Sequence, residues 1–233
     1  MSERPPFPGG GLAEAGLNRQ FLFDLDGLPE ETRKTLGDTT GFHQLILLGH
    51  AGRRLWERVQ AAGIASQHPI DDYTVCTVEA WLVEHLPGRA YRIVYPGQQP
   101  VGLQALGKLA GWHHTSPFMI GIDAEWGSWY AYRAAVLIDF QFSAFFPVDR
   151  GNPCLDCRST PCITACPADA LAGRQFNLQA CSGYRLQTES PCAEGCPARQ
   201  ACPVGAEHRY EATQIAHSYR RSLAMLRQYI DKP

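Results

Sequence analysis

The sequence has little net charge and no long basic run. Its 233 residues carry 21 Lys and Arg against 23 Asp and Glu, which gives a formal net charge of −2. Proteins that bind a nucleic-acid backbone usually present a basic patch, so nucleic acid is not expected as a partner. No segment approaches the roughly 18 apolar residues of a membrane-spanning helix, and the start, MSERPPFPGGG, lacks the apolar segment of a secretion signal. We therefore expect a cytoplasmic protein that does not enter a membrane.

Cysteine, in contrast, is abundant and unevenly placed. The chain has nine cysteines, and only Cys76 lies outside the segment from Cys154 to Cys202. The cytosol keeps thiols reduced, so this number indicates thiolate chemistry rather than a set of disulfides. Composition thus divides the chain near Gly151, with the cysteine-rich part after that residue.

The spacing of the eight clustered cysteines carries the chemical information. The first run, Cys154-x2-Cys157-x4-Cys162-x3-Cys166-Pro, is a close variant of the run in bacterial two-cluster ferredoxins, in which the fourth cysteine ligates the other cluster. A looser second run ends in Cys202-Pro, and Cys181 precedes it. This pattern assigns Cys154, Cys157, Cys162 and Cys202 to one [4Fe–4S] cluster and Cys166, Cys181, Cys192 and Cys196 to another. Zinc and disulfides remain the alternative interpretations.

The first 150 residues have the pattern of a mixed α+β domain. Residues 1–20 are rich in Gly and Pro and are expected to be flexible. Short apolar runs predict strands, and apolar residues at helical spacing predict helices. The expected strands are 45–48, 91–96, 117–122 and 129–140; a glycine turn is expected at 49–52, and helices from Arg53, over 71–85 and over 103–112. After the cysteines, apolar residues between His208 and Ile230 recur at helical spacing, with arginines near the other side. This helix presents either a solvated charged face or a docking surface for a redox partner.

Two segments resemble a known superfamily. The cysteine region, with GYRLQTES between Cys181 and Cys192, resembles the cluster domain of epoxyqueuosine reductases and reductive dehalogenases. Upstream, WGSWYAYRAAVLI is similar to segments of epoxyqueuosine reductase and of the cblC-type cobalamin-processing protein. The resemblance implies a flavin-reductase or nitroreductase-like α+β domain that holds cobalamin beside a two-cluster ferredoxin-like domain. In that arrangement Gly127, Ser128 and Trp129 line the corrin edge, and Arg133 holds an anionic group.

The resemblance also fixes the expected domain order. We expect a flexible N-terminus at 1–20, a cobalamin-type cofactor-binding domain at 21–150, the two-cluster domain at 151–207 and a C-terminal helix at 208–233. The chain has no D-x-H-x-x-G motif, so it does not supply cobalt with a histidine from such a motif. FMN is the alternative occupant, because nitroreductase-like folds commonly bind it.

The catalytic residue of the epoxyqueuosine reductases has no counterpart. Their acidic residue is expected before the LGW-like helix, where this chain reads YPGQQP without a carboxylate, and their tRNA-binding helical tail is missing. Candidate proton donors are His113, His114 and Tyr95, which are equally compatible with structural roles. Tyr130 and Tyr132 are weaker candidates, since tyrosines on strands usually belong to the core.

These observations predict an iron–sulfur oxidoreductase. It would pass single electrons through two [4Fe–4S] clusters to cobalamin, for corrinoid reduction, corrinoid processing or cobalamin-dependent reductive chemistry. One alternative is a ferredoxin-type electron carrier whose N-terminal domain docks partners, and another is a truncated epoxyqueuosine reductase-like enzyme. The expected partners are an electron donor, such as a flavodoxin, ferredoxin or reductase, and cobalamin or a corrinoid protein.

Overall fold

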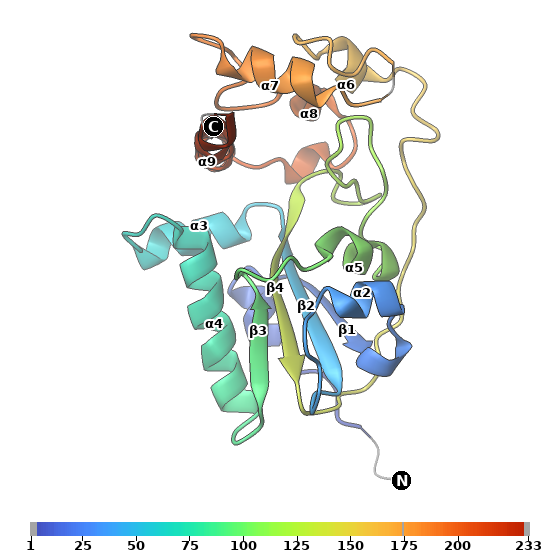
Figure 1. The fold of residues 1–233 in the computed structure, drawn as a ribbon, viewed down its shortest axis with the longest axis vertical. Coiled ribbons are helices and arrows are strands. Elements are labelled where there is room, and N and C mark those ends of the chain that lie inside the picture. Colours follow the sequence, from blue (N-terminus) through green and yellow to red (C-terminus); the bar gives the residue numbers. More distant parts are fainter. Residues whose placement is uncertain (1–3, 174, 231–233) are drawn as a thin grey trace. The chain divides into compact units, whose positions relative to one another are not determined.

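The computed structural model describes residues 4–173 and 175–230, and the chain divides into two compact units (Figure 1). The first unit contains the chain up to His113 together with Tyr130–Asp149. The second contains His114–Trp129 together with the chain from Arg150 onward. The sequence predicts a division near Gly151, and the structure adds the loop 114–129 to the cysteine-rich unit.

A four-stranded antiparallel sheet forms the centre of the first unit. Its strands are β1 (Arg19–Asp24), β2 (Gln44–Ala51), β3 (Tyr91–Tyr95) and β4 (Tyr130–Ile138). The order across the sheet is β1-β2-β4-β3, and every neighbouring pair is antiparallel. All eight residues of β2 are buried, as expected for a central strand covered on both faces. The predicted α+β class is thereby confirmed.

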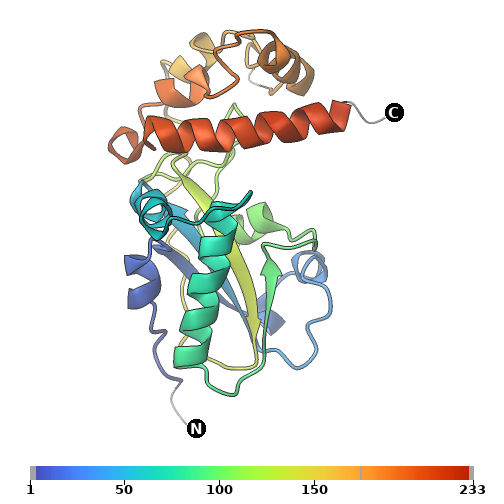
Figure 2. The same ribbon diagram turned by 90° about the vertical axis from the view of Figure 1, so that its left-hand side faces the viewer.

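Helices cover the sheet. The helices of this unit are α1 (Gly10–Glu14), α2 (Glu30–Lys34), α3 (Arg54–Ala62), α4 (Pro69–His85) and α5 (Leu103–Leu109), with a 3₁₀ turn, η1 (Leu25–Gly27). Helix α4 lies across one face (Figure 2), where Val78, Trp81 and Leu82 belong to the same buried cluster as Ile46 and Val136 of the sheet. Helices α2 and α5 lie on the opposite side of the sheet (Figure 1). Burial of these apolar side chains is the main force that holds the layers together.

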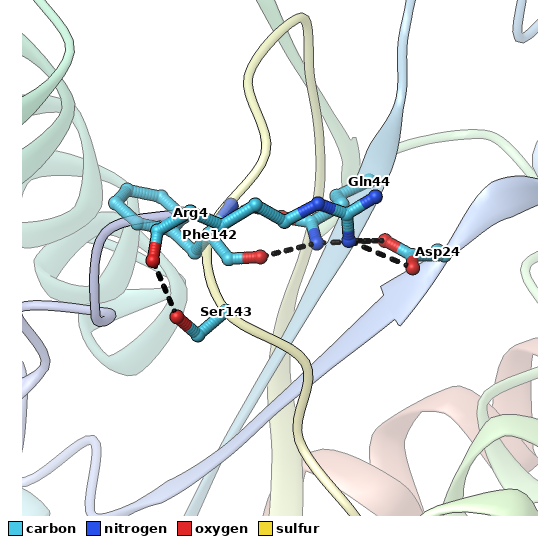
Figure 3. Close-up of polar contacts among 5 residues, drawn as sticks. All are labelled: Arg4, Asp24, Gln44, Phe142 and Ser143. Atoms are coloured by element: carbon cyan, nitrogen blue, oxygen red, sulfur yellow. Dashed lines mark hydrogen bonds and ion pairs between the residues drawn. The ribbon is translucent and has the colours of Figure 1, made fainter. Parts of the chain in front are cut away.

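The segment expected to be flexible at 1–20 is packed over its described residues, 4–20. Helix α1 forms there, and Leu12 and Leu17 are buried. Arg4 reaches the carboxylate of Asp24, and its carbonyl accepts a hydrogen bond from the Ser143 hydroxyl at 2.7 Å (Figure 3). Apolar and polar contacts with distant segments therefore fix a stretch whose composition alone suggested a loose chain.

Two expected elements differ from those observed. The strand expected at 45–48 continues through Gly49, expected as a turn, to Ala51, and the turn comes at Gly52, where φ is +72°. The strand expected at 117–122 is a loop with one isolated bridge between His114 and Ile122. Met119 has φ of +60°, a left-handed conformation that a strand does not accommodate.

The second unit is built from short helices and one long one. They are α6 (Pro161–Thr164), α7 (Leu178–Leu186), α8 (Pro197–Ala201) and α9 (Ala212–Ile230), with a 3₁₀ turn, η2 (Ala206–His208). Figure 2 shows α9 as a long helix, and it contacts α7. The last three residues of the expected C-terminal segment lie outside the described residues. Among the described residues, none of the helices has the length and apolar character that crossing a membrane requires.

Candidate metal centre

The first set of cysteine thiols lies around a small cavity. Cys154, Cys157, Cys162 and Cys202 all line this cavity, whose volume is about 40 Å³. The turn before α6 is held by Asn152, whose side-chain oxygen accepts the Cys154 backbone N–H at 3.0 Å. Cys162 is the second residue of α6. Cys202, the residue after the end of α8, completes the set. The structure thus brings together the four cysteines that the spacing assigns to one cluster.

The second set lines a larger cavity. Cys166, Cys181, Cys192 and Cys196 all contribute to its wall, and its volume is about 300 Å³. Cys181 is presented by α7, whose start is capped by Asn177: the side-chain oxygen accepts the backbone N–H of Ala180 at 3.0 Å. Cys196 is the N-cap of α8. These are the four cysteines that the sequence assigns to the second cluster.

The two sets interlock along the chain. Cys166 follows the three early cysteines of the first set but lines the second cavity, and Cys202 follows the second set but lines the first cavity. This exchange of the last cysteine of each run is the arrangement of two-cluster bacterial ferredoxins. Phe118, from the loop 114–129, lines both cavities.

The thiols in each set raise one another's pKa. Burial, and then the other three thiols of its set, raise the pKa of Cys154 to about 11. The same causes raise the pKa of Cys192 to about 11, although Arg185 acts in the opposite direction. Burial is also the largest cause that raises the pKa values of Cys162, Cys181 and Cys202. Four thiolates become compatible with such a site when a metal centre neutralises them, so the residues fit a thiolate-bound metal group.

The sulfur atoms of the two cysteine sets further restrict which metal group could bind. Each set consists of four sulfur donors, which select soft or borderline metals such as iron in clusters or zinc. Within the part of the chain that the structure describes, no three Cys, His, Asp or Glu side chains form a site for a single metal ion. In each set the thiols are arranged around a cavity.

The loop 114–129 is built into the cysteine unit by close backbone packing. Gly127 has φ of +59°, and a methyl group on its Cα would overlap the Val204 carbonyl, two residues after Cys202. Gly205 has φ of +63°, and a methyl group there would overlap the backbone of Trp126. Both positions therefore require glycine.

Ser128 and Trp129 are fully buried in this unit. The Ser128 hydroxyl and carbonyl both accept hydrogen bonds from the guanidinium of Arg199, which lies 4.4 Å from the centre of the Trp129 ring. Arg133 belongs to the first unit, where its Nε donates to Nδ1 of His50 at 2.8 Å. That Gly127, Ser128, Trp129 and Arg133 bind a corrin stays a prediction.

The candidate proton donors occupy different surroundings. His113 is buried in the first unit, and its Nδ1 lies 3.2 Å from the Tyr132 hydroxyl and 3.4 Å from that of Tyr130. His114 belongs to the second unit and bridges to Ile122 through its backbone. Burial raises the pKa of Tyr95 despite the nearby charge of Arg133. His113 thus joins a polar group with two tyrosines, a grouping that the separate motifs did not reveal.

Sequence reasoning missed Phe118 and Arg199. Phe118 stood in a short apolar run interpreted as a strand, and such runs do not distinguish a strand from a buried loop. Arg199 stands three residues after Cys196 in CPAR, where the helical turn of α8 brings it back toward that thiol. The sequence Cys-Pro-Ala-Arg could have indicated this contact, because cysteine followed by proline is a possible helix start that places the arginine in the first helical turn.

Solved structures with a similar fold exist, although no protein-family model and no curated protein matches the sequence. An epoxyqueuosine reductase solved with a modified tRNA stem loop is similar, with a TM-score of 0.56 and 14% identity over 88% of this chain and 66% of that chain. A catabolic reductive dehalogenase in complex with 3-bromo-4-hydroxybenzoic acid has a TM-score of 0.52 and 14% identity over 97% of this chain and 38% of that chain. The B12-trafficking protein CblC of C. elegans has a TM-score of 0.48 and 14% identity over 92% of this chain and 90% of that one.

The superfamily that the sequence resembles is thus represented among the structural neighbours, and the fold relationship is confirmed. The chain spans about two thirds of the length of the epoxyqueuosine reductase and 38% of the dehalogenase. At these identities the similarity concerns the fold.

Proposed function

We propose that this chain is an iron–sulfur oxidoreductase that passes single electrons through two [4Fe–4S] clusters to cobalamin. One observation carries the proposal: eight cysteines form two interlocked sets of four, and each set surrounds its own cavity. The last cysteine of each run lines the cavity of the other run, which is the exchange found in two-cluster ferredoxins. Two neighbouring sets of four thiolates match two clusters, which supply one-electron transfer when bound.

The protein's own residues would hold the clusters and exclude water. Cys154, Cys157, Cys162 and Cys202 would ligate the first, and Cys166, Cys181, Cys192 and Cys196 the second. Phe118 forms a common wall, and Ile120 and Phe176 add apolar surface to the second cavity. Apolar lining of this kind controls solvent access and therefore the reduction potential of the bound group.

The assignment of domain types belongs to the same proposal. The interlocked cysteine order supports a ferredoxin-like second unit, and the antiparallel sheet with helices on both sides is compatible with a nitroreductase-like first unit. Cobalamin is proposed because of the sequence resemblance, with Arg133 as the residue that holds an anionic group. The donor is proposed to be a flavodoxin, ferredoxin or reductase.

A second candidate function is an epoxyqueuosine reductase-like reaction on RNA. The fold similarity to the reductase solved with a tRNA stem loop favours it. The net charge of −2 and the missing carboxylate in YPGQQP oppose it. Reduction of an epoxyqueuosine-containing stem loop by the reduced protein is the direct assay.

The experiment begins with purification in the absence of oxygen. About eight irons and eight sulfides per chain are expected, since each of two clusters contains four of each. Cys154→Ser and Cys181→Ser should each lose about half of the iron, because they affect different sets. Cys76→Ser is the matched control, since Cys76 is exposed on α4 and should leave the iron content unchanged.

Titration with hydroxocobalamin and with FMN then tests the cofactor. Tight uptake of hydroxocobalamin, followed by cobalt reduction when dithionite-reduced protein is added, would support the corrinoid proposal. Uptake of FMN without uptake of hydroxocobalamin would show that the cofactor is a flavin and not cobalamin. Eight irons without uptake of either compound would leave an electron carrier, and zinc in place of iron would overturn the cluster assignment.

A further inference from the structure

Arg199 is a buried cation in the wall of the second cavity. Only 8% of its surface is exposed, and it lines the cavity together with Cys166, Cys181, Cys192 and Cys196. It lies in α8, which begins after Cys196, and its backbone N–H donates to Sγ of that cysteine at 3.4 Å. An arginine, whose guanidinium carries a delocalised positive charge, thus lines the same cavity as the four cysteines.

Neutral groups hold this guanidinium in place. Nε donates to the Ser128 hydroxyl at 3.2 Å, and Nη2 donates to the Ser128 carbonyl. The guanidinium carbon lies 4.4 Å from the ring centre of Trp129 and 5.0 Å from that of Tyr210. The Tyr219 hydroxyl also forms a hydrogen bond with Arg199. All four of these partner residues are uncharged.

A buried cation with neutral partners is costly unless an anionic group lies nearby. Removing a charge from water without a counter-charge is strongly unfavourable, because the lost hydration is not replaced. The negative charge available here is that of the four cysteines when they bind a cluster as thiolates. The cavity and the guanidinium thus fit each other as anion and cation.

Hydrogen bonds at the same cysteine act in the same direction. The backbone N–H of Arg199 donates to Sγ of Cys196 at 3.4 Å, and the Tyr219 hydroxyl also forms a hydrogen bond with this thiol. Donors to a thiolate ligand stabilise the more negative, reduced form of a cluster. A second arginine, Arg185, donates to the Cys192 carbonyl at 3.2 Å.

The first cavity has a weaker cationic environment. Arg209 donates to the Cys202 carbonyl at 3.2 Å, but it is only partly buried. Charges closer to solvent are screened more strongly than buried ones. Direct donors occur at both sites, since backbone N–H groups also form hydrogen bonds with the thiols of Cys162 and Cys202. The second site differs in its buried guanidinium, Arg199, and in a second arginine, Arg185, whereas the first has the partly buried Arg209.

We propose that Arg199 is the counter-cation of the second cluster and makes it the higher-potential centre, so that electrons pass from the Cys154 set to the Cys181 set. This inference rests on the proposed function, because it requires clusters at both sites. A positive charge beside a cluster favours the reduced form, which carries one more negative charge. Ser128 and Trp129 are then positioning residues for Arg199.

The test is an anaerobic redox titration of the full chain, followed by electron paramagnetic resonance. Arg199→Gln removes the charge and keeps a hydrogen-bonding side chain. We expect at least a tenfold loss in the reduction equilibrium constant of the second cluster, which is 59 mV more negative for a one-electron couple. The first cluster should change much less. Arg220→Gln is the matched control, because Arg220 lies in the same unit but is exposed and paired with Glu194.

Two further measurements test the role of Arg199 if the Arg199→Gln variant does not assemble its clusters. Arg199→Lys keeps the charge and should retain a higher-potential cluster; if it assembles with a potential as low as that of the first cluster, the proposal is wrong. Cys181→Ser in the otherwise unaltered chain should abolish the higher of the two potentials and leave the lower one. Loss of the lower potential would contradict the assigned direction of electron flow.

The outcomes separate this inference from the proposed function. A chain without iron, or with zinc, would contradict the cluster assignment before any potential is measured. Eight irons in both wild type and Arg199→Gln, with indistinguishable potentials, would leave the clusters in place and overturn the role of Arg199.

Discussion

The backbone of Gly127 packs directly against that of Gly205, and both residues have positive φ. Gly127 lies in the loop before β4, whereas Gly205 follows Cys202 by three residues, so the contact ties this loop to a cysteine of the first set. A side chain on either glycine would overlap backbone atoms that cannot move independently. The assembly of the first cysteine site is thus coupled to the position of the loop 114–129.

Gly127→Ala should therefore destabilise the cysteine unit. Overpacking combined with a left-handed backbone predicts a loss of about 2 kcal/mol or more in the free energy of unfolding. Iron content after anaerobic purification should fall along with the midpoint of urea unfolding. Gly183→Ala is the control: its added methyl group meets no atom within 4 Å, and alanine favours the interior of α7. Equal iron content and stability in the two variants would contradict the coupling.

Asp24 gives the first unit an acid-sensitive contact. Burial acts to raise the pKa of this carboxyl, but hydrogen bonds from Gln44 and Arg4, together with the charge of Arg4, outweigh burial and lower it (Figure 3). Gln44 donates to Asp24 at 2.8 Å and also bonds both backbone groups of Phe142. A carboxyl with a lowered pKa stabilises the fold above its unfolded pKa of about 4, and this contribution is lost as the pH falls through the folded value.

Asp24→Asn should lower the free energy of unfolding by about 0.5–1 kcal/mol at pH 7, a modest effect because the Arg4–Asp24 pair is partly exposed. The difference from wild type should stay constant down to about pH 5 and shrink below about pH 4. Urea unfolding followed by tryptophan fluorescence measures it. Asp26→Asn, at an exposed position of η1, should match wild type throughout. A difference that grows toward low pH would have the wrong sign for this explanation.

The sequence groups the cysteines by short spacings, and the same two groups line two cavities in the structure; that they ligate clusters stays a prediction. Cys154, Cys157 and Cys162 are close in the chain, and the exchange of Cys166 and Cys202 follows a known pattern. The central strands were also predictable, since β2 and β4 are buried apolar runs. The sequence pattern did not predict the strand β1. It also placed a turn at Gly49, whereas this residue pairs with Arg19 of β1 and Tyr132 of β4 inside the sheet. Glycine is frequent in turns, but pairing with two neighbouring strands keeps it in a strand here.

The surroundings of the cysteines were not predictable from local pattern. Phe118 and Arg199 are 81 positions apart in the numbering and line the same cavity through tertiary packing. The corrin roles suggested for Ser128 and Trp129 came from resemblance, whereas the hydrogen bonds and ring contact with Arg199 depend on the fold. The periodicity of apolar residues and the spacing of cysteines carry no information on such tertiary contacts.

Arg133 allows the corrinoid proposal to be tested apart from the clusters. Its Nε donates to His50, and its two Nη groups are of the kind that donate to an anionic group. Arg133→Gln should weaken hydroxocobalamin binding about tenfold, the effect of losing one charge-assisted hydrogen bond of about 1.4 kcal/mol. Iron content should be unchanged. Arg54→Gln, at an exposed position of α3, is the control, and equal affinities in the two variants would remove Arg133 from the site.

Phe118 should protect both cysteine sites at once, because its buried ring lines both cavities and packs with Cys162, Leu171 and Ala198. Phe118→Ala creates a cavity between the sites and admits water, which should cost about 3–5 kcal/mol of stability. Both clusters should then bleach faster in air, and the visible absorbance should decay in one phase rather than two. Met119→Ala is the neighbouring control, since Met119 is 62% exposed and should leave the decay unchanged. Accelerated loss of only half the iron would show that Phe118 shields one site alone, because a common wall must act on both.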